Sequence, residues 1–416
     1  MELKSGYKQS EVGIIPEDWE VEPLGGMADF ITSGSRGWAQ FYSESGALFI
    51  RSQNVRDGRL SFADIQYVSP PSGAEGNRTK VRSSDLLITV TGNSVGNVAL
   101  VEQAYDEAYI SQHVGLVRLK EPTSGAYICR YLSPGSPGNK QIASSQSGQS
   151  KPGLNLQNLK DFSIALPPTP CEQRAIATAL SDVDGLLDGL DRLIAKKRDL
   201  KQSAMQQLLT GQTRLPGFQG EWKVKPLKKI VETPVTDGPH LTPNFLDDGI
   251  PFLSVNNLVA NKIDLGDLRF ISQQDHEVFS RKCKPQKGDV LLGKAASVGK
   301  VAIVELTSEF NIWSPIALIR VSDSHCARFV YYQLQSADLI GQITLFTNSS
   351  SQGNIGMGDI EKLSLRLPSY SEQSAIASVL TDMDAELAAL EQHRDKTRAL
   401  KQAMMQELLT GRTRLV

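Results

Sequence analysis

The chain has 416 residues, a length that predicts two or three domains at about 150 residues each. Lys and Arg total 44 against 46 for Asp and Glu, and 40% of the residues are hydrophobic, which is an ordinary globular composition. This balance excludes a chain that coats nucleic acid through its net charge, and it excludes an acidic disordered chain. Any contact with nucleic acid must therefore use local patches.

A long internal repeat divides the chain into four segments. Residues 171–215 align without a gap to residues 371–415, with 24 identities in 45 positions. The segments that precede these two copies correspond only weakly, through short matches such as FIRSQN with FLSVNN. We therefore expect two variable domains and two constant helices, with the domains at 1–168 and 212–368 and the helices at 169–211 and 369–416.

The first segment, residues 1–168, predicts a mixed α/β domain built on short strands. Runs rich in β-forming residues occur at 49–50, 86–90 and 116–119, and each is bounded by Gly, Pro, Asn or Ser. The stretch 92–96 begins and ends with glycine and predicts a tight turn, because glycine reaches positive φ without strain. Irregular, turn-rich sheets are expected.

The second segment, residues 169–211, predicts one long helix. Prolines precede it and Gly211 follows it, which are start and stop signals for a helix. At 1.5 Å per residue the helix would be roughly 60 Å long. Apolar side chains recur in alternating steps of four and three residues, as in the seam of a coiled coil: Ile176, Leu180, Val183, Leu187 and Leu190.

The second half of the chain repeats this plan. Residues 212–368 contain β-rich runs at 252–255, 290–292 and 316–321, with a turn expected at 296–299. Residues 369–416 predict the second long helix, because the same apolar seam recurs there: Ile376, Leu380, Met383, Leu387 and Leu390.

In both helices acidic residues fill the first half and basic residues fill the second, as Asp184 and Lys201 show in one copy and Asp384 and Lys401 in the other. An antiparallel pair places each acidic half beside a basic half, whereas a parallel pair places acid beside acid. The same polarity also complements each helix's own dipole, an alternative that the sequence leaves open. The predicted fold is α+β: two mixed α/β domains joined by two long helices in an antiparallel coiled coil, with a pseudo-two-fold repeat.

The familiar catalytic and metal-binding motifs are missing from the sequence. The four cysteines form no CxxC pair, the five histidines show no HxxxH or HxH spacing, and there is no GxSxG or GxGxxG motif. Residues 293–300 faintly resemble a phosphate loop, but the glycine spacing is one residue too long and Val301 replaces the Ser or Thr that would hold magnesium. We expect no catalytic residues and no metal site, although spacing alone leaves a dispersed carboxylate site open.

The localisation expected from the sequence is cytoplasmic. Cysteines scattered without a framework are typical of a reducing compartment, and the longest apolar run, Leu86–Val90, is far too short to cross a bilayer.

Polar loops that follow the predicted strands are candidates for contacts with DNA. Arg and Gln side chains form paired hydrogen bonds with guanine and adenine, and Lys neutralises phosphates. The alternative is that each cluster is simply a solvated loop, but matched clusters in both domains favour a shared role. The first cluster and its counterpart contain Arg51, Gln53, Asn54, Arg56 and Arg59, and Asn256, Asn257 and Lys262; the second pair contains Ser147, Gln149 and Lys151, and Ser350, Gln352 and Asn354, with Lys294 as a further basic residue.

The whole arrangement resembles the specificity subunit of type I restriction-modification systems. Each motif is weak alone, but their order and duplication are specific. The second copy departs from the pattern only in carrying Pro368-Ser369 instead of two prolines. The motifs are Ile15-Pro16-x-x-Trp19, Leu166-Pro167-Pro168 with Glu172-Gln173, Leu367-Pro368 with Glu372-Gln373, and the Leu-Leu-Thr-Gly helix ends at 208–211 and 408–411.

The resemblance implies a DNA-binding role without catalysis. Each target recognition domain would read one half of a bipartite, asymmetric DNA site, and the helices would set the nonspecific spacer between the halves. Two modification subunits would supply S-adenosylmethionine and adenine-N6 methylation, and restriction subunits would supply ATP- and Mg-dependent translocation and cleavage. Two alternatives stay open: a related system in which cleavage and methylation share one polypeptide, and a coiled-coil scaffold that does not bind DNA.

Overall fold

A computed structural model describes residues 5–56, 58–70, 74–145, 153–347 and 353–415. The chain divides into two compact units, each considered by itself. Unit 1 contains residues 1–191 and 392–416, and unit 2 contains residues 192–391. Each unit therefore holds one variable domain, here domain 1 or domain 2, together with one part of each long helix.

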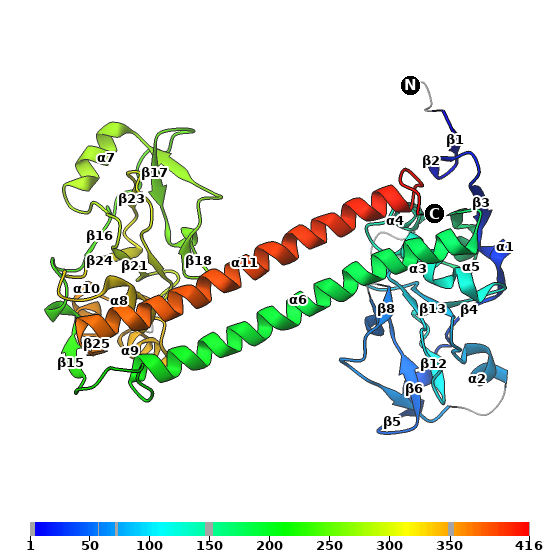
Figure 1. The fold of residues 1–416 in the computed structure, drawn as a ribbon, viewed down its shortest axis with the longest axis horizontal. Helices are drawn as coiled ribbons and strands as arrows, with labels where there is room; N and C mark the ends of the chain where they lie inside the picture. The colour runs from blue at the N-terminus through cyan, green and yellow to red at the C-terminus, as the bar shows by residue number, and fades with distance from the viewer. Residues whose placement is uncertain (1–4, 57, 71–73, 146–152, 348–352, 416) are drawn as a thin grey trace. The chain divides into compact units, whose positions relative to one another are not determined.

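The two long helices are α6 (Pro170–Thr210) and α11 (Tyr370–Leu408) (Figure 1). Helix α6 lies within one residue of its predicted range. Helix α11 stops before the predicted end at residue 416, because Gly411 adopts a φ of +68° and the last residues turn back. Gly211, with a φ of +75°, follows α6 in the same way.

Domain 1 contains fourteen strands and five short helices within the described residues. Its 3-10 turns are η1 (Trp38–Phe41), η2 (Ser52–Asn54) and η3 (Pro122–Ser124), and its α-helices are α1 (Leu24–Met27), α2 (Ala74–Thr79), α3 (Gly125–Leu132), α4 (Asn139–Ser145) and α5 (Leu156–Asp161). The strands are β1 (Tyr7–Ser10), β2 (Gly13–Pro16), β3 (Glu20–Pro23), β4 (Ala28–Ser33), β5 (Tyr42–Ser43), β6 (Ala47–Ile50), β7 (Val55–Arg56), β8 (Arg59–Leu60), β9 (Tyr67–Val68), β10 (Leu86–Thr89), β11 (Val98–Leu100), β12 (Ala108–Ile110), β13 (Val114–Leu119) and β14 (Ser163–Leu166).

Domain 2 repeats the larger part of this order. Its strands are β15 (Lys223–Pro226), β16 (Thr236–Asp237), β17 (Ile250–Leu253), β18 (Leu258–Val259), β19 (Lys262–Ile263), β20 (Arg269–Ile271), β21 (Val290–Gly293), β22 (Val301–Ile303), β23 (Asn311–Ile312), β24 (Ile316–Ile319) and β25 (Ser364–Leu367). Its helices are η4 (Leu227–Lys229), η5 (Val255–Asn257), α7 (Gln273–Ser280), α8 (Ala327–Gln333), α9 (Ala337–Phe346) and α10 (Met357–Ile360).

The two domains share their sheet topology. Domain 1 has an antiparallel sheet in the order β11-β10-β13-β4, and domain 2 has the matching order β22-β21-β24-β16. A second sheet contains the parallel pair β6 and β12 in domain 1, and the parallel pair β17 and β23 in domain 2. Strand β14, which pairs with β3, directly precedes α6, and strand β25, which pairs with β15, directly precedes α11. The predicted pseudo-two-fold repeat is confirmed at the level of strand order.

The central strands are buried on both faces. In β10, Leu86 and Ile88 belong to one core and Leu87 belongs to another, and in β21 Leu291 likewise lies in a different core from its neighbours. This explains why both strands read as continuous apolar runs rather than alternating patterns. Two predicted runs extend two residues beyond the observed strands: β17 ends at Leu253, because the chain then turns into η5, and β24 ends at Ile319.

The antiparallel prediction for the helices is confirmed in each unit by ion pairs. In unit 1 the Lys401 ammonium of α11 lies 2.6 Å from the Asp184 carboxylate of α6. In unit 2 the Lys201 ammonium of α6 lies 2.5 Å from the Asp384 carboxylate of α11. The acidic start of each helix therefore lies beside the basic end of the other.

The predicted seam is only partly a contact between the two helices. Ile176 and Leu180 pack into the core of domain 1, and Ile376 and Leu380 pack into the core of domain 2. These residues therefore fasten helices to domains as well as to each other, and supercoiling itself stays a prediction. The buried seam residues are Ile176, Leu180, Leu190, Ile376, Leu380 and Leu387, and the partly exposed ones are Val183, Leu187, Met383 and Leu390.

Candidate nucleic-acid interface

Two of the predicted DNA-contacting residues instead hold the backbone. Asn54 is 2% exposed; its side-chain oxygen accepts from the Arg51 amide at 2.9 Å, and its side-chain nitrogen donates to the Ser61 carbonyl at 2.9 Å. Asn257 is 6% exposed and makes the matching bonds, accepting from the Ser254 amide at 2.9 Å. Because buried amides with satisfied hydrogen bonds cannot reach DNA, we withdraw Asn54 and Asn257 from the candidate contacts.

Other residues of this first cluster are drawn into ion pairs. The Arg51 guanidinium lies 2.9 Å from the Asp64 carboxylate, and Gln53 also donates to Asp64. The Arg59 guanidinium pairs with Asp188 of α6, with one contact at 2.7 Å, and so serves to fasten domain 1 to its helix. The cluster residues that stay at the surface are Gln53, which is held by Asp64, and Arg56, Asn256 and Lys262.

The second predicted cluster is only partly visible. Ser147, Gln149, Lys151, Ser350 and Gln352 lie outside the described residues. Asn354 is exposed and forms a backbone bridge with Ala295, just after β21. In domain 1 the matching bridge joins Gly153 to Thr91, just after β10. Gly153 and Asn354 therefore each lie beside the turn that follows the central strand of their domain.

In domain 1 the loops after β4, β10 and β12 bring polar side chains together near that turn. Arg78 of α2 donates to the Ser33 carbonyl at the end of β4 at 2.8 Å, and to the Ser35 hydroxyl at 2.8 Å. Gln112 and His113 follow β12 and are exposed, and the His113 ring also contacts the Thr91 hydroxyl. Sequence reasoning missed Gln112 and His113, because the histidines were considered only for the spacing of metal ligands; their place directly after the short strand β12 was the available signal.

In domain 2 the same place is built differently. Asp237 ends β16, as Ser33 ends β4, and its fully buried carboxylate lies 2.5 Å from the Lys282 ammonium and 3.2 Å from the Lys294 ammonium. Burial raises the pKa of Asp237, but hydrogen bonds from the two lysines more than offset this, so its pKa lies below the usual value. The Lys294 side chain is only 11% exposed, so we reassign it from phosphate contact to partner of Asp237. Lys282, half-exposed, is the better candidate for a phosphate contact.

Close backbone packing fixes these loops relative to the sheets. A Cβ atom at Gly238, which follows Asp237, would lie 1.7 Å from the Ile312 carbonyl oxygen, so only glycine fits there. Gly34 makes the same approach in domain 1, where a Cβ would lie 2.2 Å from the Ser111 carbonyl carbon. The loop after β4 or β16 is thus pressed against the loop after β12 or β23. Each domain therefore holds its own set of loops against its sheets in the same way, and the two sets carry different side chains.

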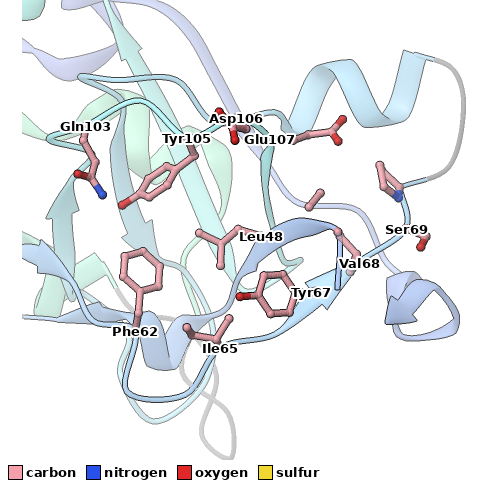
Figure 2. Close-up of a pocket in the computed structure, with 13 residues that line it drawn as sticks. Leu48, Phe62, Ile65, Tyr67, Val68, Ser69, Gln103, Tyr105, Asp106 and Glu107 are labelled. Carbon is pink, nitrogen blue, oxygen red and sulfur yellow. The ribbon is translucent and has the colours of Figure 1, made fainter. Parts of the chain in front are cut away.

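A pocket of about 720 Å³ opens elsewhere on domain 1 (Figure 2). Apolar and aromatic side chains line it, among them Leu48, Phe62 and Tyr105, and Asp106 and Glu107 lie at one side. Because two carboxylates would repel phosphate, we give this pocket no part in DNA contact.

Metal and membrane features are likewise missing from the part of the chain that is described. No group of three His, Cys, Asp or Glu side chains in the described ranges is arranged to hold a metal ion. Among the same residues, no helix combines the length and apolarity needed to cross a membrane.

Comparison with known proteins decides the family. The family described as "Type I restriction modification DNA specificity domain" matches the chain twice, at residues 16–196 and 219–398. The chain belongs to this family. It is a type I restriction-modification specificity subunit, the DNA-recognition component rather than an enzyme, and such subunits act on DNA with modification and restriction subunits. Domains 1 and 2 are its two recognition domains.

Individual relatives agree over nearly the whole chain. The MjaVIII specificity subunit of Methanocaldococcus jannaschii is 22% identical over 434 residues, which is 99% of this chain and 97% of the relative. The EcoKI specificity subunit of Escherichia coli is 22% identical over 423 residues, which is 95% of this chain and 89% of the relative. Among solved structures, the S subunit from M. genitalium gives a TM-score of 0.62 at 15% identity, with 98% of each chain covered. The last comparison supports the fold.

Proposed function

We propose that this specificity subunit binds a bipartite, asymmetric DNA site, and that each recognition domain reads one half through its loops after β4, β10 and β12 or after β16, β21 and β23. The observation that carries the proposal is a shared framework with different side chains. Where domain 1 presents Arg78, Gln112 and His113, domain 2 presents Lys282 and, directly after β23, the partly exposed Trp313. Two similar folds with different surfaces favour two different half-sites.

We further propose that two modification subunits bind this chain, one for each repeat, and that restriction subunits join them. The repeated helix ends support the stoichiometry, since two matching surfaces suit two copies of one partner. S-adenosylmethionine, ATP and Mg would then belong to those partners, and this chain would carry no cofactor.

The test is methylome sequencing of a host that lacks other adenine methyltransferases and carries this chain with its modification subunit. The proposal expects N6-methyladenine in both halves of a bipartite motif. The double variant Q112A/H113A should relax the sequence of one half only, by about 1–3 kcal/mol of discrimination for each lost paired contact. The variant K282A, which removes the candidate phosphate contact of domain 2, should weaken binding to all DNA sequences and lower the salt dependence of that binding. No methylation by a stable, intact complex would contradict the proposal.

The helices supply a second prediction, that their length sets the spacer. Seven residues, or two helical turns, inserted into α6 after Asp191 and into α11 after Glu391 add about 10 Å, or about three base pairs at 3.4 Å each. The methylated motif should gain a spacer longer by that amount while both half-sites stay the same. An unchanged spacer in a folded, active complex would rule out this role.

A further inference from the structure

In unit 1, two carboxylates on successive turns of α6 hold recognition domain 1. Asp184 pairs with Arg130 of α3 and lies 2.6 Å from Lys401 of α11. The Arg130 and Asp184 side chains are only 13% and 19% exposed. One turn further along, Asp188 pairs with both terminal nitrogens of Arg59 in β8. Paired guanidinium contacts fix orientation as well as distance, so domain 1 is fastened at two points.

In unit 2 the contact that corresponds to Arg130–Asp184 is kept, but the residue from the domain is uncharged. Asp384 corresponds to Asp184 in the repeat, and it accepts from the Tyr332 hydroxyl of α8 at 2.8 Å and from Lys201 at 2.5 Å. Tyr332 stands where domain 1 has Arg130, so the domain contributes a hydroxyl instead of a charge.

The second fastening is missing from unit 2. Lys262 begins the second strand of the β18–β19 hairpin, as Arg59 begins the second strand of the β7–β8 hairpin. Its partner position on α11 is occupied by Ala388, where the repeat places Asp188 in α6. An alanine side chain cannot pair with a lysine, and Lys262 forms no ion pair with any of the described residues.

A cavity occupies the place of the missing contact. It measures about 340 Å³ and lies within unit 2 between β19, α8 and α11. Lys262, Tyr332, Asp384 and Ala388 all line it. The pocket separates Lys262 from Ala388, so at this turn the β18–β19 hairpin lacks the direct tie to its helix that Arg59 and Asp188 give in unit 1.

We propose that the specificity subunit holds its two recognition domains unequally, and that recognition domain 2 shifts on its helices more readily than recognition domain 1. Asp188 is then a positioning residue for domain 1. Ala388 marks the contact between domain 2 and α11 that permits movement. Joined to the function proposed above, on which this last step rests, domain 2 is the side that adjusts when the DNA spacer departs from its preferred length.

The first test measures distances in the free, full-length protein. Spectroscopic labels introduced through unnatural amino acids at Asp106 and Asp182 report on unit 1, and labels at Ser308 and Asp382 report on the matching places in unit 2. All four positions are exposed. The proposal expects a broader distance distribution in unit 2. Equal widths in the two units would overturn it.

Two substitutions exchange the properties of the joints. A388D offers Lys262 a carboxylate and should narrow the unit 2 distribution, whereas the matched control A388N, without charge, should not. D188N should broaden the unit 1 distribution, and D188E should restore it. In 1 M salt, where the Debye length is about 3 Å, the effect of A388D should fade. If A388D folds and leaves the width unchanged, the missing charged contact is not what loosens domain 2.

The second test uses the complex with its modification subunit and DNA sites with spacers one base pair longer or shorter. A388D should lower methylation of the altered sites relative to the preferred site, and D188N should raise it. Unequal widths with unchanged spacer preference would overturn the role in spacer adjustment. Failure of the unsubstituted complex to methylate any bipartite site would instead count against the proposed function, because the distance measurement needs no DNA.

Discussion

Units 1 and 2 are completed by the same contacts at their helix ends, but they differ in the side chains that their loops expose. In unit 1, Arg414 pairs with the buried Glu172 and lies over the Trp19 ring at 5.9 Å. In unit 2, Arg214 pairs with the buried Glu372 and lies over the Trp222 ring at 5.7 Å. The segment that follows α11 thus completes unit 1, which contains the start of α6. The segment that follows α6 completes unit 2, which contains the start of α11. The closing contacts at the helix ends are repeated residue by residue, whereas the contacts of Asp188 and the loops differ between the units.

The largest expected effect comes from breaking the closing contact. R414A leaves Glu172, whose side chain is 3% exposed, as a buried charge without its main partner. Loss of one partner of a buried ion pair costs 3–5 kcal/mol, and because Arg414 is about one-third exposed we expect about 3 kcal/mol. Arg414 also pairs with Asp18 at 2.9 Å, so R414A should destabilise unit 1 more than R214A destabilises unit 2.

The measurement is urea unfolding of the full chain, followed by circular dichroism. R412A is the matched control, since Arg412 is exposed and its nearest contact to Glu407 is 3.7 Å, and it should change the unfolding free energy by less than about 1 kcal/mol. Equal effects of R412A and R414A would show that closure of unit 1 does not depend on the buried carboxylate.

The framework asparagines give the next effect. N54A and N257A each leave three backbone groups of a buried turn without their partner, which we expect to cost about 2 kcal/mol. The two variants should cost nearly the same, because the turns make the same bonds, and neither should alter the methylated sequence. A change of half-site specificity in folded N54A would return this residue to the DNA-contact group.

The repeat and helical periodicity predicted most of the frame, because an apolar seam and a gap-free duplication depend on sequence spacing alone. Strand runs such as Leu86–Val90 were equally visible, since burial on both faces demands continuous apolar residues. The site was less predictable. Asn54 and Gln112 are both polar loop residues in the sequence, and only tertiary packing decides that one turns inward to hold carbonyls while the other faces solvent.

The smallest expected effect is on how the free energy of unfolding depends on pH. It should distinguish Asp237 in unit 2 from its counterpart Ser33 in unit 1. Because Lys282 and Lys294 lower the pKa of Asp237, its stabilising effect is full above the unfolded-state pKa and is lost as the pH falls through the lower folded-state pKa. At neutral pH, D237N should destabilise by about 1.5 kcal/mol, the low end for a hydrogen bond to a charged group. As the pH falls below about 4, the difference between the two proteins should shrink, since a protonated aspartate then resembles asparagine. Serine does not titrate, so S33A should show a difference independent of pH. A D237N difference that stays constant down to acid unfolding would mean that the lysines do not hold this carboxylate in its charged form.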